Sequence, residues 1–406
     1  MDNGQALDGV KVLDFTWWGA GPFFTKYLAD FGATVVKVES RKRLDLLRLS
    51  EPYRDGRVEV DTSAMFLHAN TGKLSITVDF SLPKGRELIM RLVQWADVVA
   101  ENFSAGFMER SGLGYEALRQ VKPDIIMLSS SCLGQTGVYT DLRGHALVGA
   151  ALSGHFHLTG YPDAEPTTPA SIGVADVFQP MFSVAAVLAA LEHRRRTGEG
   201  QYIDLAQAEV MDHYMTPALL EMQANHGSPH RTGNRHPQAA PHGVFRCQGD
   251  DRWVAIAAFT QEEWQGLCRA LGNPAWCGEE RFATLAGRKQ HEAELERLVT
   301  AWTQKRTAEE AMEHLQRHGV AAGAVQNPQD MMERDPQVRA RDLFPVLHHP
   351  VIGDCAHPPP PPQLSRSPAQ LKTSPLLGEH NEMVLCQFLG LSAEELAGLI
   401  NEGVVH

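Results

Sequence analysis

The sequence predicts an α/β protein with a large domain built on a parallel sheet and a smaller α+β domain. Three observations lead to this prediction. Short β-branched runs alternate with helix-like segments in the first half of the chain. A polar link rich in Gly, Pro and His follows, and after it the pattern changes to a hairpin and amphipathic helices.

The first predicted unit is a strand over residues 10–15, a helix over 23–31 and a strand over 34–39. Two β-branched runs on either side of one helix are typical of parallel strands joined by a crossover. The turn GAGP at 19–22 lies between the first strand and the helix. It lacks the third glycine of a dinucleotide-binding turn, so it indicates helix initiation and argues against a Rossmann dehydrogenase.

The same alternation continues through the first third of the chain. The predicted segments are a strand at 75–79, a helix at 85–95 started by Pro83, a strand at 97–100, a helix at 114–120 and a strand at 124–129. An open parallel sheet binds ligands beyond the carboxyl ends of its strands, so we expect the functional site there.

The second half begins with a link or active-site loop at 225–241. The segments predicted after it are a hairpin of 243–247 with 253–257, helices at 261–271, 291–304 and 308–318, an extended tract of five prolines at 358–362, and a final helix that Ser392 caps. The expected domains are residues 1–224, a small domain at 225–325, and a linker with a C-terminal return at 326–406.

Composition excludes several classes of protein. The 406 residues are 43% hydrophobic and contain no run of 18 apolar positions, so we expect no membrane span. Residues Met1–Gly4 do not resemble the start of a targeting segment, so we expect a cytoplasmic protein. A net charge of −12 disfavours nucleic acid as a partner. Six cysteines without a Cys-x-x-Cys pair predict neither a metal site nor a disulfide framework.

Asp176 is the candidate catalytic residue. It is a lone acid among apolar residues, and a long helix-like run over 181–191 follows it. A carboxylate in such surroundings must be satisfied, neutralised or used, and a helix N-terminus helps to keep it ionised. The local alternative is that Asp176 only caps the helix.

Nine short blocks, in order along nearly the whole chain, together resemble the family III CoA-transferases, a family that includes the related α-methylacyl-CoA racemases. The blocks are VLDFT at 12–16, AGP at 20–22, LADFGA at 28–33, VKVE at 36–39, ENF at 101–103, GLGY at 112–115, GQTG at 134–137, RTGEGQ at 196–201 and GEHN at 378–381. Each block alone is weak, and their combination is specific.

The resemblance implies a nucleophile at Asp176, which follows the LTG segment at 158–160 as the family's aspartate does. In that chemistry the carboxylate attacks an acyl-CoA thioester and forms a mixed anhydride, and the returning thiolate then forms an aspartyl-CoA thioester. An acceptor carboxylate reverses these steps. The expected partners are therefore an acyl-CoA such as succinyl-CoA and a carboxylic acid, with no permanently bound cofactor.

The resemblance also implies a set of CoA contacts. They are Lys73, Asn102, Phe103, Arg110, Arg143, His145, and Arg41 in place of an arginine that some members carry where this chain has Ser40. Arg and Lys suit phosphates because they donate charge-assisted hydrogen bonds. Taken singly, Lys73 and Arg110 are equally explained as solvated surface charges.

Two other functions stay open. Gly144 and His145 match part of the racemase pattern, in which His145 and Asp176 would act as the two bases on opposite faces of an α-carbon. The chain continues Ala146-Leu147, however, where the racemases continue with an aspartate. Alternatively, the chain is one subunit of a hetero-oligomeric transferase for an aromatic acid such as benzylsuccinate, and Trp17 and Trp18 would suit that bulky pocket.

For the whole molecule, the resemblance implies two interlocked chains, as a homodimer or with a related subunit. In each chain a Rossmann-like large domain would be made from both ends of the sequence. Formyl-CoA:oxalate transfer is disfavoured, because residues 233–241 lack the glycine-rich loop of that enzyme.

Overall fold

A computed structural model describes residues 4–167 and 173–406. The chain forms two compact units, which are described separately. Of the described residues, the large unit comprises 4–155, 173–227 and 341–406, and the small unit comprises 156–167 and 228–340. The expected boundaries at 224 and 325 differ from these, because 156–167 and 326–340 belong to the small unit.

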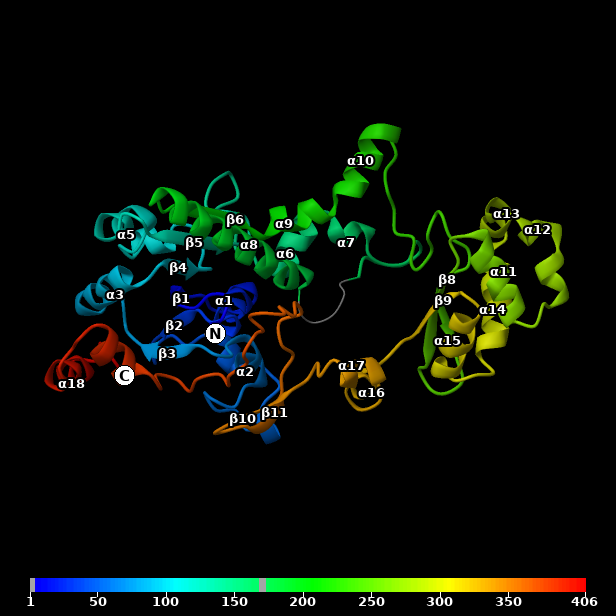
Figure 1. The fold of residues 1–406 in the computed structure, drawn as a ribbon. Helices are drawn as coiled ribbons and strands as arrows, with labels where there is room; N and C mark the ends of the chain where they lie inside the picture. The colour runs from blue at the N-terminus through cyan, green and yellow to red at the C-terminus, as the bar shows by residue number, and fades with distance from the viewer. Residues whose placement is uncertain (1–3, 168–172) are drawn as a thin grey trace. The chain divides into compact units, whose positions relative to one another are not determined.

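A six-stranded parallel sheet forms the centre of the large unit (Figure 1). Its strands in spatial order are β3 (Leu74–Thr77), β2 (Thr34–Glu39), β1 (Lys11–Phe15), β4 (Val98–Glu101), β5 (Ile126–Ser131) and β6 (Tyr202–Ala206). The α/β prediction is confirmed, and so are the five strands expected before residue 131.

Helices cover both faces of the sheet, because successive residues of a strand point to opposite sides. Leu13 and Phe15 pack with α3 (Pro83–Trp95) and α5 (Tyr115–Val121). Val12 faces the other side, toward α1 (Ala20–Asp30) and α8 (Val174–Thr197). The remaining elements of the large unit before residue 228 are η1 (Leu46–Leu49), η2 (Arg54–Gly56), α2 (Ala64–Ala69), α4 (Phe107–Arg110), α6 (Ala146–Leu152), α9 (Gln207–Tyr214) and α10 (Thr216–Asn225). Helix α7 (His155–Leu158) spans the point in the sequence where the chain passes into the small unit.

The C-terminal segment returns to this sheet, so both ends of the chain build the large unit. Val405 bridges to Val78 beyond β3, and the backbone N–H of Thr77, the last residue of β3, donates to Oδ1 of Asn381 at 2.8 Å. The elements of this segment are β10 (Val346–His349), β11 (Gly353–Ala356), the π-helix η4 (Met383–Phe388) and α18 (Ala393–Asn401), which Ser392 caps as predicted.

The small unit combines a three-stranded antiparallel sheet with helices. The sheet order is β7 (His242–Arg246), β8 (Trp253–Ala257) and β9 (Ala321–Ala324), which confirms the predicted hairpin and adds one strand. The helices are α11 (Gln261–Ala270), η3 (Ala275–Gly278), α12 (Glu280–Ala283), α13 (Leu285–Gln290), α14 (Glu292–Thr303), α15 (Ala308–Arg317), α16 (Pro328–Glu333) and α17 (Pro336–Ala340). An ion pair of Arg252 with Asp330 ties α16 to this unit.

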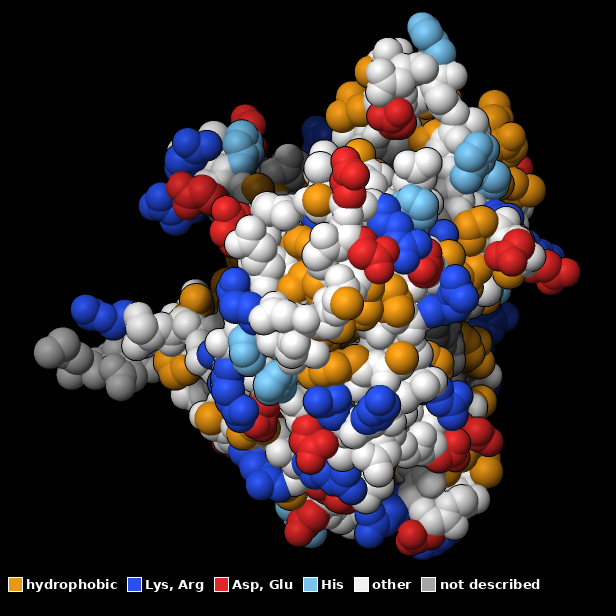
Figure 2. Space-filling view, turned by 90° about the vertical axis from the view of Figure 1, so that its right-hand side faces the viewer, with side chains coloured by type: hydrophobic (Ala, Val, Ile, Leu, Met, Phe, Trp, Pro, Cys, Tyr) orange, Lys and Arg blue, Asp and Glu red, His pale blue; other side chains and the backbone are white. Residues whose placement is uncertain are grey.

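Two properties of the surface bear on partners. On the face shown in Figure 2, acidic and basic side chains are intermixed, with apolar side chains between them. Among the described residues, α8 alone is long and apolar enough to cross a membrane by length and composition, with one third of its most apolar window buried. A single helix of this kind is weak support for a span, because core helices of globular proteins have the same composition.

Candidate active site

Asp176 lies in the first turn of α8, where Gly173 occupies the N-cap position. Its carboxylate does not cap its own helix. Instead it accepts a hydrogen bond from Nε2 of Gln207 at 2.8 Å and another from the backbone N–H of Ala20. The structure therefore overturns the interpretation of Asp176 as a helix cap.

The first turns of three helices meet at this carboxylate. Ala20 begins α1, Gln207 begins α9, and Asp176 itself lies near the start of α8. The N-terminal end of a helix carries a partial positive charge and free N–H groups. Negative charge on Asp176, or on an intermediate formed there, is therefore stabilised from three directions.

The pKa of Asp176 is raised from its usual range because the side chain is largely removed from water. The hydrogen bonds from Gln207 and from the Ala20 N–H, together with the positive potential of His145, lower the pKa and partly oppose that effect. A desolvated carboxylate that is still held ionised by donors has the character of a nucleophile.

Gly19 allows the turn after β1 to approach the carboxylate. Its φ of +63° is in the left-handed region, and a Cβ built on it would lie 2.9 Å from Oδ1 of Asp176. A Cβ on Gly21 would lie 2.6 Å from the side chain of Thr16. The glycines of the GAGP turn thus permit close packing, and Pro22 is the third residue of α1.

Asn102 forms hydrogen bonds that hold the backbone of Trp17 and Trp18, the two residues before Gly19. Its Oδ1 accepts from the backbone N–H of Trp17 at 2.7 Å, and its Nδ2 donates to the carbonyls of Trp17 at 2.6 Å and Trp18 at 3.0 Å. Trp18 has a φ of +51°, which is costly for a residue with a side chain. These contacts hold that conformation beside Asp176.

Three adjoining cavities extend from Asp176 through the large unit. The first, of about 280 Å³, contains Asp176, Gln207, Cys132 and His145 in its wall. The second, of about 360 Å³, shares Asn102, Cys132 and Gly144 with it. The third, of about 550 Å³, shares Phe103 and Arg110 with the second and Trp17 with the first.

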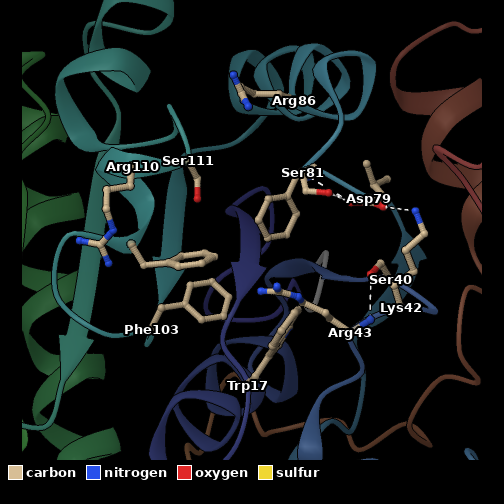
Figure 3. Close-up of a pocket in the computed structure, with 13 residues that line it drawn as sticks. Trp17, Ser40, Lys42, Arg43, Asp79, Ser81, Arg86, Phe103, Arg110 and Ser111 are labelled. Atoms are coloured by element: carbon tan, nitrogen blue, oxygen red, sulfur yellow. Dashed lines mark hydrogen bonds and ion pairs between the residues drawn. The ribbon is translucent and has the colours of Figure 1, made fainter. Parts of the chain in front are cut away.

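The third cavity is basic and aromatic (Figure 3). Its lining includes four cations and four aromatic rings, namely Lys42, Arg43, Arg86, Arg110, Trp17, Phe80, Phe103 and Phe107. The ring of Phe103 packs edge-on against Trp17 with centroids 5.0 Å apart. The buried Nε of Arg86 has no hydrogen-bond partner among the described residues. Guanidinium groups and aromatic faces together suit the phosphates and base of a nucleotide.

The other predicted contacts divide into those that line the cavities and those that do not. Asn102, Phe103, Arg110 and Arg143 line the second cavity, and His145 lines the first. The side chain of Arg41 is exposed and lies outside all three, whereas its neighbours Lys42 and Arg43 line the third.

The structure corrects the prediction for Lys73. Its ammonium is completely buried and donates to Asp14 Oδ2 at 3.0 Å, Thr25 Oγ1 at 2.7 Å, Asn70 Oδ1 at 2.9 Å and the carbonyl of Pro22 at 3.0 Å. Burial lowers the pKa of Lys73 to about 8. Lys73 therefore stabilises the backbone and side chains around Asp14 and Asn70, and its ammonium does not face a ligand.

Sequence reasoning missed Gln207, Lys42, Arg43 and Arg86. Gln207 directly follows a strand of the parallel sheet, which is the position where such sheets place their ligands, and this was the available signal.

Within the described residues no group of three His, Cys, Asp or Glu side chains is arranged to hold a metal ion.

A family model described as CoA-transferase family III matches residues 7–381. This chain belongs to CoA-transferase family III. It is 35% identical over 403 residues to a succinyl-CoA–D-citramalate CoA-transferase of Chloroflexus aurantiacus, covering 99% of this chain and 98% of that one. It is 34% identical over 395 residues to a succinate–glutarate CoA-transferase of Agrobacterium fabrum, covering 94% and 95%.

A crystal structure gives the same result for the fold. A CaiB/BaiF family protein from Brucella suis superposes with a TM-score of 0.86 at 34% identity, over 95% of this chain and 99% of that one. The family III enzyme described here is therefore a CoA-transferase with the fold expected for its family.

Proposed function

We propose that this family III transferase moves CoA from an acyl-CoA thioester to a carboxylic acid through covalent intermediates on Asp176. The observation that carries the proposal is the position of the Asp176 carboxylate. It accepts hydrogen bonds from Gln207 and the Ala20 N–H where three helices begin, and it lines the first of the three adjoining cavities. The third of these cavities is lined by cations.

The steps balance without any group beyond the two substrates. One oxygen of Asp176 attacks the thioester carbonyl carbon, the C–S bond breaks, and CoA leaves as a thiolate. The thiolate then attacks the aspartyl carbonyl carbon and expels the donor acid as its carboxylate. An acceptor carboxylate displaces CoA from the aspartyl thioester, and the thiolate finally takes the acceptor acyl group from Asp176.

We place the nucleotide end of CoA in the basic, aromatic cavity and the thioester beside Asp176. Arg43, Arg86 and Arg110 supply the positive charge that phosphates require, and Asn102 and Phe103 lie along the path between the two ends.

Arg110→Gln tests this placement. We expect KM for acyl-CoA to rise by about tenfold, with kcat unchanged, because a contact remote from the reacting atoms is made equally in the ground and transition states. Lys84→Gln is the matched control, since Lys84 is exposed, pairs with Glu402 and lies outside the three cavities. Equal KM values in the two variants would contradict the placement.

For the acyl group we propose dicarboxylic acids of about the length of succinate. The Chloroflexus and Agrobacterium relatives act, by their names, on succinyl-CoA or succinate together with citramalate or glutarate. A third relative, 35% identical over 389 residues and covering 94% of this chain and 96% of its own, is a succinyl-CoA:mesaconate CoA-transferase of Haloarcula marismortui. Apart from Asp176 and Cys132, the ionisable side chain in the described wall of the first cavity is His145, which can bind a second carboxylate.

Covalent trapping tests the whole mechanism. Purified protein is incubated with succinyl-CoA, treated with hydroxylamine or borohydride, and digested for mass spectrometry. We expect one modified residue, Asp176, and none in Asp176→Ala. A panel of citramalate, glutarate, mesaconate and benzylsuccinate then identifies the acceptor. Failure to label Asp176 with any acyl-CoA would contradict the mechanism.

We also propose that the enzyme acts as a dimer. Helices α8 and α10 expose apolar side chains at Val177, Met181, Leu188, Leu219, Leu220 and Met222. An apolar surface of this kind on a globular protein marks an interaction site.

A further inference from the structure

Among the residues that the structure describes, Gln207 is the one whose side chain donates a hydrogen bond to the carboxylate of Asp176, with Nε2 lying 2.8 Å from Oδ1. It is only 5% exposed. As the first residue of α9, directly after β6, it is anchored by two elements of the large unit. Because an ionised carboxylate only accepts hydrogen bonds, the NH₂ group of the amide must face it.

We propose that Gln207 is a further catalytic residue, which holds Oδ1 of Asp176 so that Oδ2 attacks and which then stabilises the oxyanion that forms on Oδ1. This inference rests on the proposed function of Asp176. It assigns the donor for the second step, in which the enzyme's own carbonyl is attacked.

The distinction between the two oxygens follows from the chemistry. In the mixed anhydride Oδ2 bridges Asp176 to the acyl group, and Oδ1 is the aspartyl carbonyl oxygen. When the CoA thiolate forms its bond to Cγ, negative charge develops on Oδ1. Collapse of this intermediate breaks the Cγ–Oδ2 bond, and the donor acid leaves as a carboxylate that carries Oδ2. No proton moves, so a neutral amide donor is sufficient.

The environment increases the effect of this donor. Gln207 is buried and Asp176 is largely desolvated, so a hydrogen bond between them is stronger than one in water. The donor is already in place before charge develops, so no reorganisation is required at the moment of reaction. If the Gln207–Asp176 hydrogen bond only joined α9 to α8, its loss would lower the stability of the protein and would leave kcat unchanged.

The experiment compares Gln207→Met, which keeps the size and removes the donor, with Gln207→Glu, which replaces the donor by an acceptor. We expect kcat of the Met variant to fall by about 10²-fold, the usual effect of removing one oxyanion donor, with KM for acyl-CoA within about twofold of wild type. The acid limb of its kcat/KM profile moves to higher pH, since the lost hydrogen bond favoured the ionised carboxylate. Gln207→Glu is impaired at least as strongly.

Thermal unfolding and acyl-CoA binding establish that each variant is folded. Gln120→Met, at an exposed position on α5, is the matched control and retains wild-type kinetics. Wild-type kcat and an unshifted acid limb in Gln207→Met, or wild-type kcat in Gln207→Glu, would overturn the inference. If wild-type protein labels at Asp176 and these variants are normal, only the role of Gln207 fails. If wild-type protein does not label, the proposed function fails as well.

Discussion

At the scale of single residues, the reactivity of Asp176 follows from opposing effects on its pKa. Removal from water raises the pKa, while Gln207, the N–H of Ala20 and His145 lower it. The net effect is a carboxyl group that ionises at a higher pH than a free aspartate, and so is a stronger base and nucleophile when it is ionised.

This balance predicts the pH dependence of the reaction. In the proposed mechanism the ionised form of Asp176 is required for attack, so we expect activity above the raised pKa and its loss as the pH falls through that pKa. We expect kcat/KM for acyl-CoA to fall about tenfold per pH unit on the acid limb, with a midpoint above the usual aspartate range. A pH–rate profile measures this. A midpoint at or below that of a free aspartate would contradict the raised pKa.

His145 is predicted to select the acyl group. In His145→Ala, KM for succinyl-CoA should rise by about tenfold, which is the order expected when a charge-assisted hydrogen bond is lost. KM for butyryl-CoA, which has no second carboxylate, should stay unchanged. The same variant tests the racemase alternative, because the loss of α-proton exchange with transfer retained would reveal a second, acid–base role for His145.

Asp176 and Lys73 show how far the sequence alone could specify the site. Asp176 stood out locally as an acid between apolar residues before a helix, but that pattern alone favoured a helix cap, and it was the resemblance along the whole chain that made this residue the candidate nucleophile. Lys73 was misassigned because its ammonium is buried against Asp14 and Thr25, which are 59 and 48 residues away in sequence. Gln207 was missed for the same reason, since only the fold brings it to an aspartate 31 residues away.

At the scale of elements, the turn between β1 and α1 positions Asp176, the proposed nucleophile. It supplies the Ala20 N–H and, at Gly19, the absence of a side chain, while Asn102 at the end of β4 fixes its backbone. The site is thus built from the carboxyl ends of neighbouring strands, as the doubly wound pattern predicted.

Gly19→Ala is expected to lower kcat by about 10²-fold, because its Cβ would displace Oδ1 of Asp176 by a substantial part of an ångström. Gly198→Ala is the matched control. Gly198 has a φ of +79° with no atom within 4 Å of a Cβ, so an alanine there also takes a positive φ but meets no neighbouring atom. Steady-state kinetics of both variants separate the two effects. Equal activity losses would show that backbone strain alone is responsible.

The elements themselves were predictable to different degrees. Alternating β-branched runs correctly predicted β1, β2, β3, β4 and β5, because those patterns are local. Strand β9 reads Ala-Ala-Gly-Ala and has no β-branched residue, so nothing in its sequence distinguished it from a loop. Residues 321–324 form a strand because their backbone pairs with β8 in antiparallel register.

At the scale of the whole molecule, the exposed apolar side chains of α8 and α10 predict self-association. Leu220→Glu should convert a dimer to a monomer, because Leu220 is 57% exposed and a buried, unpaired charge is costly. Leu364→Glu, at another exposed leucine outside these helices, is the control. Light scattering coupled to size exclusion measures both variants. A monomeric wild-type enzyme would contradict the prediction.

The convergence of three helix starts on Asp176 has a consequence for engineering. Ala20, Asp176 and Gln207 come from three distant parts of the chain, yet all belong to the large unit. The donors that hold the proposed nucleophile therefore lie outside residues 228–340. Substitutions within that segment are therefore expected to leave the direct supports of the Asp176 carboxylate, the Gln207 amide and the Ala20 N–H, in place.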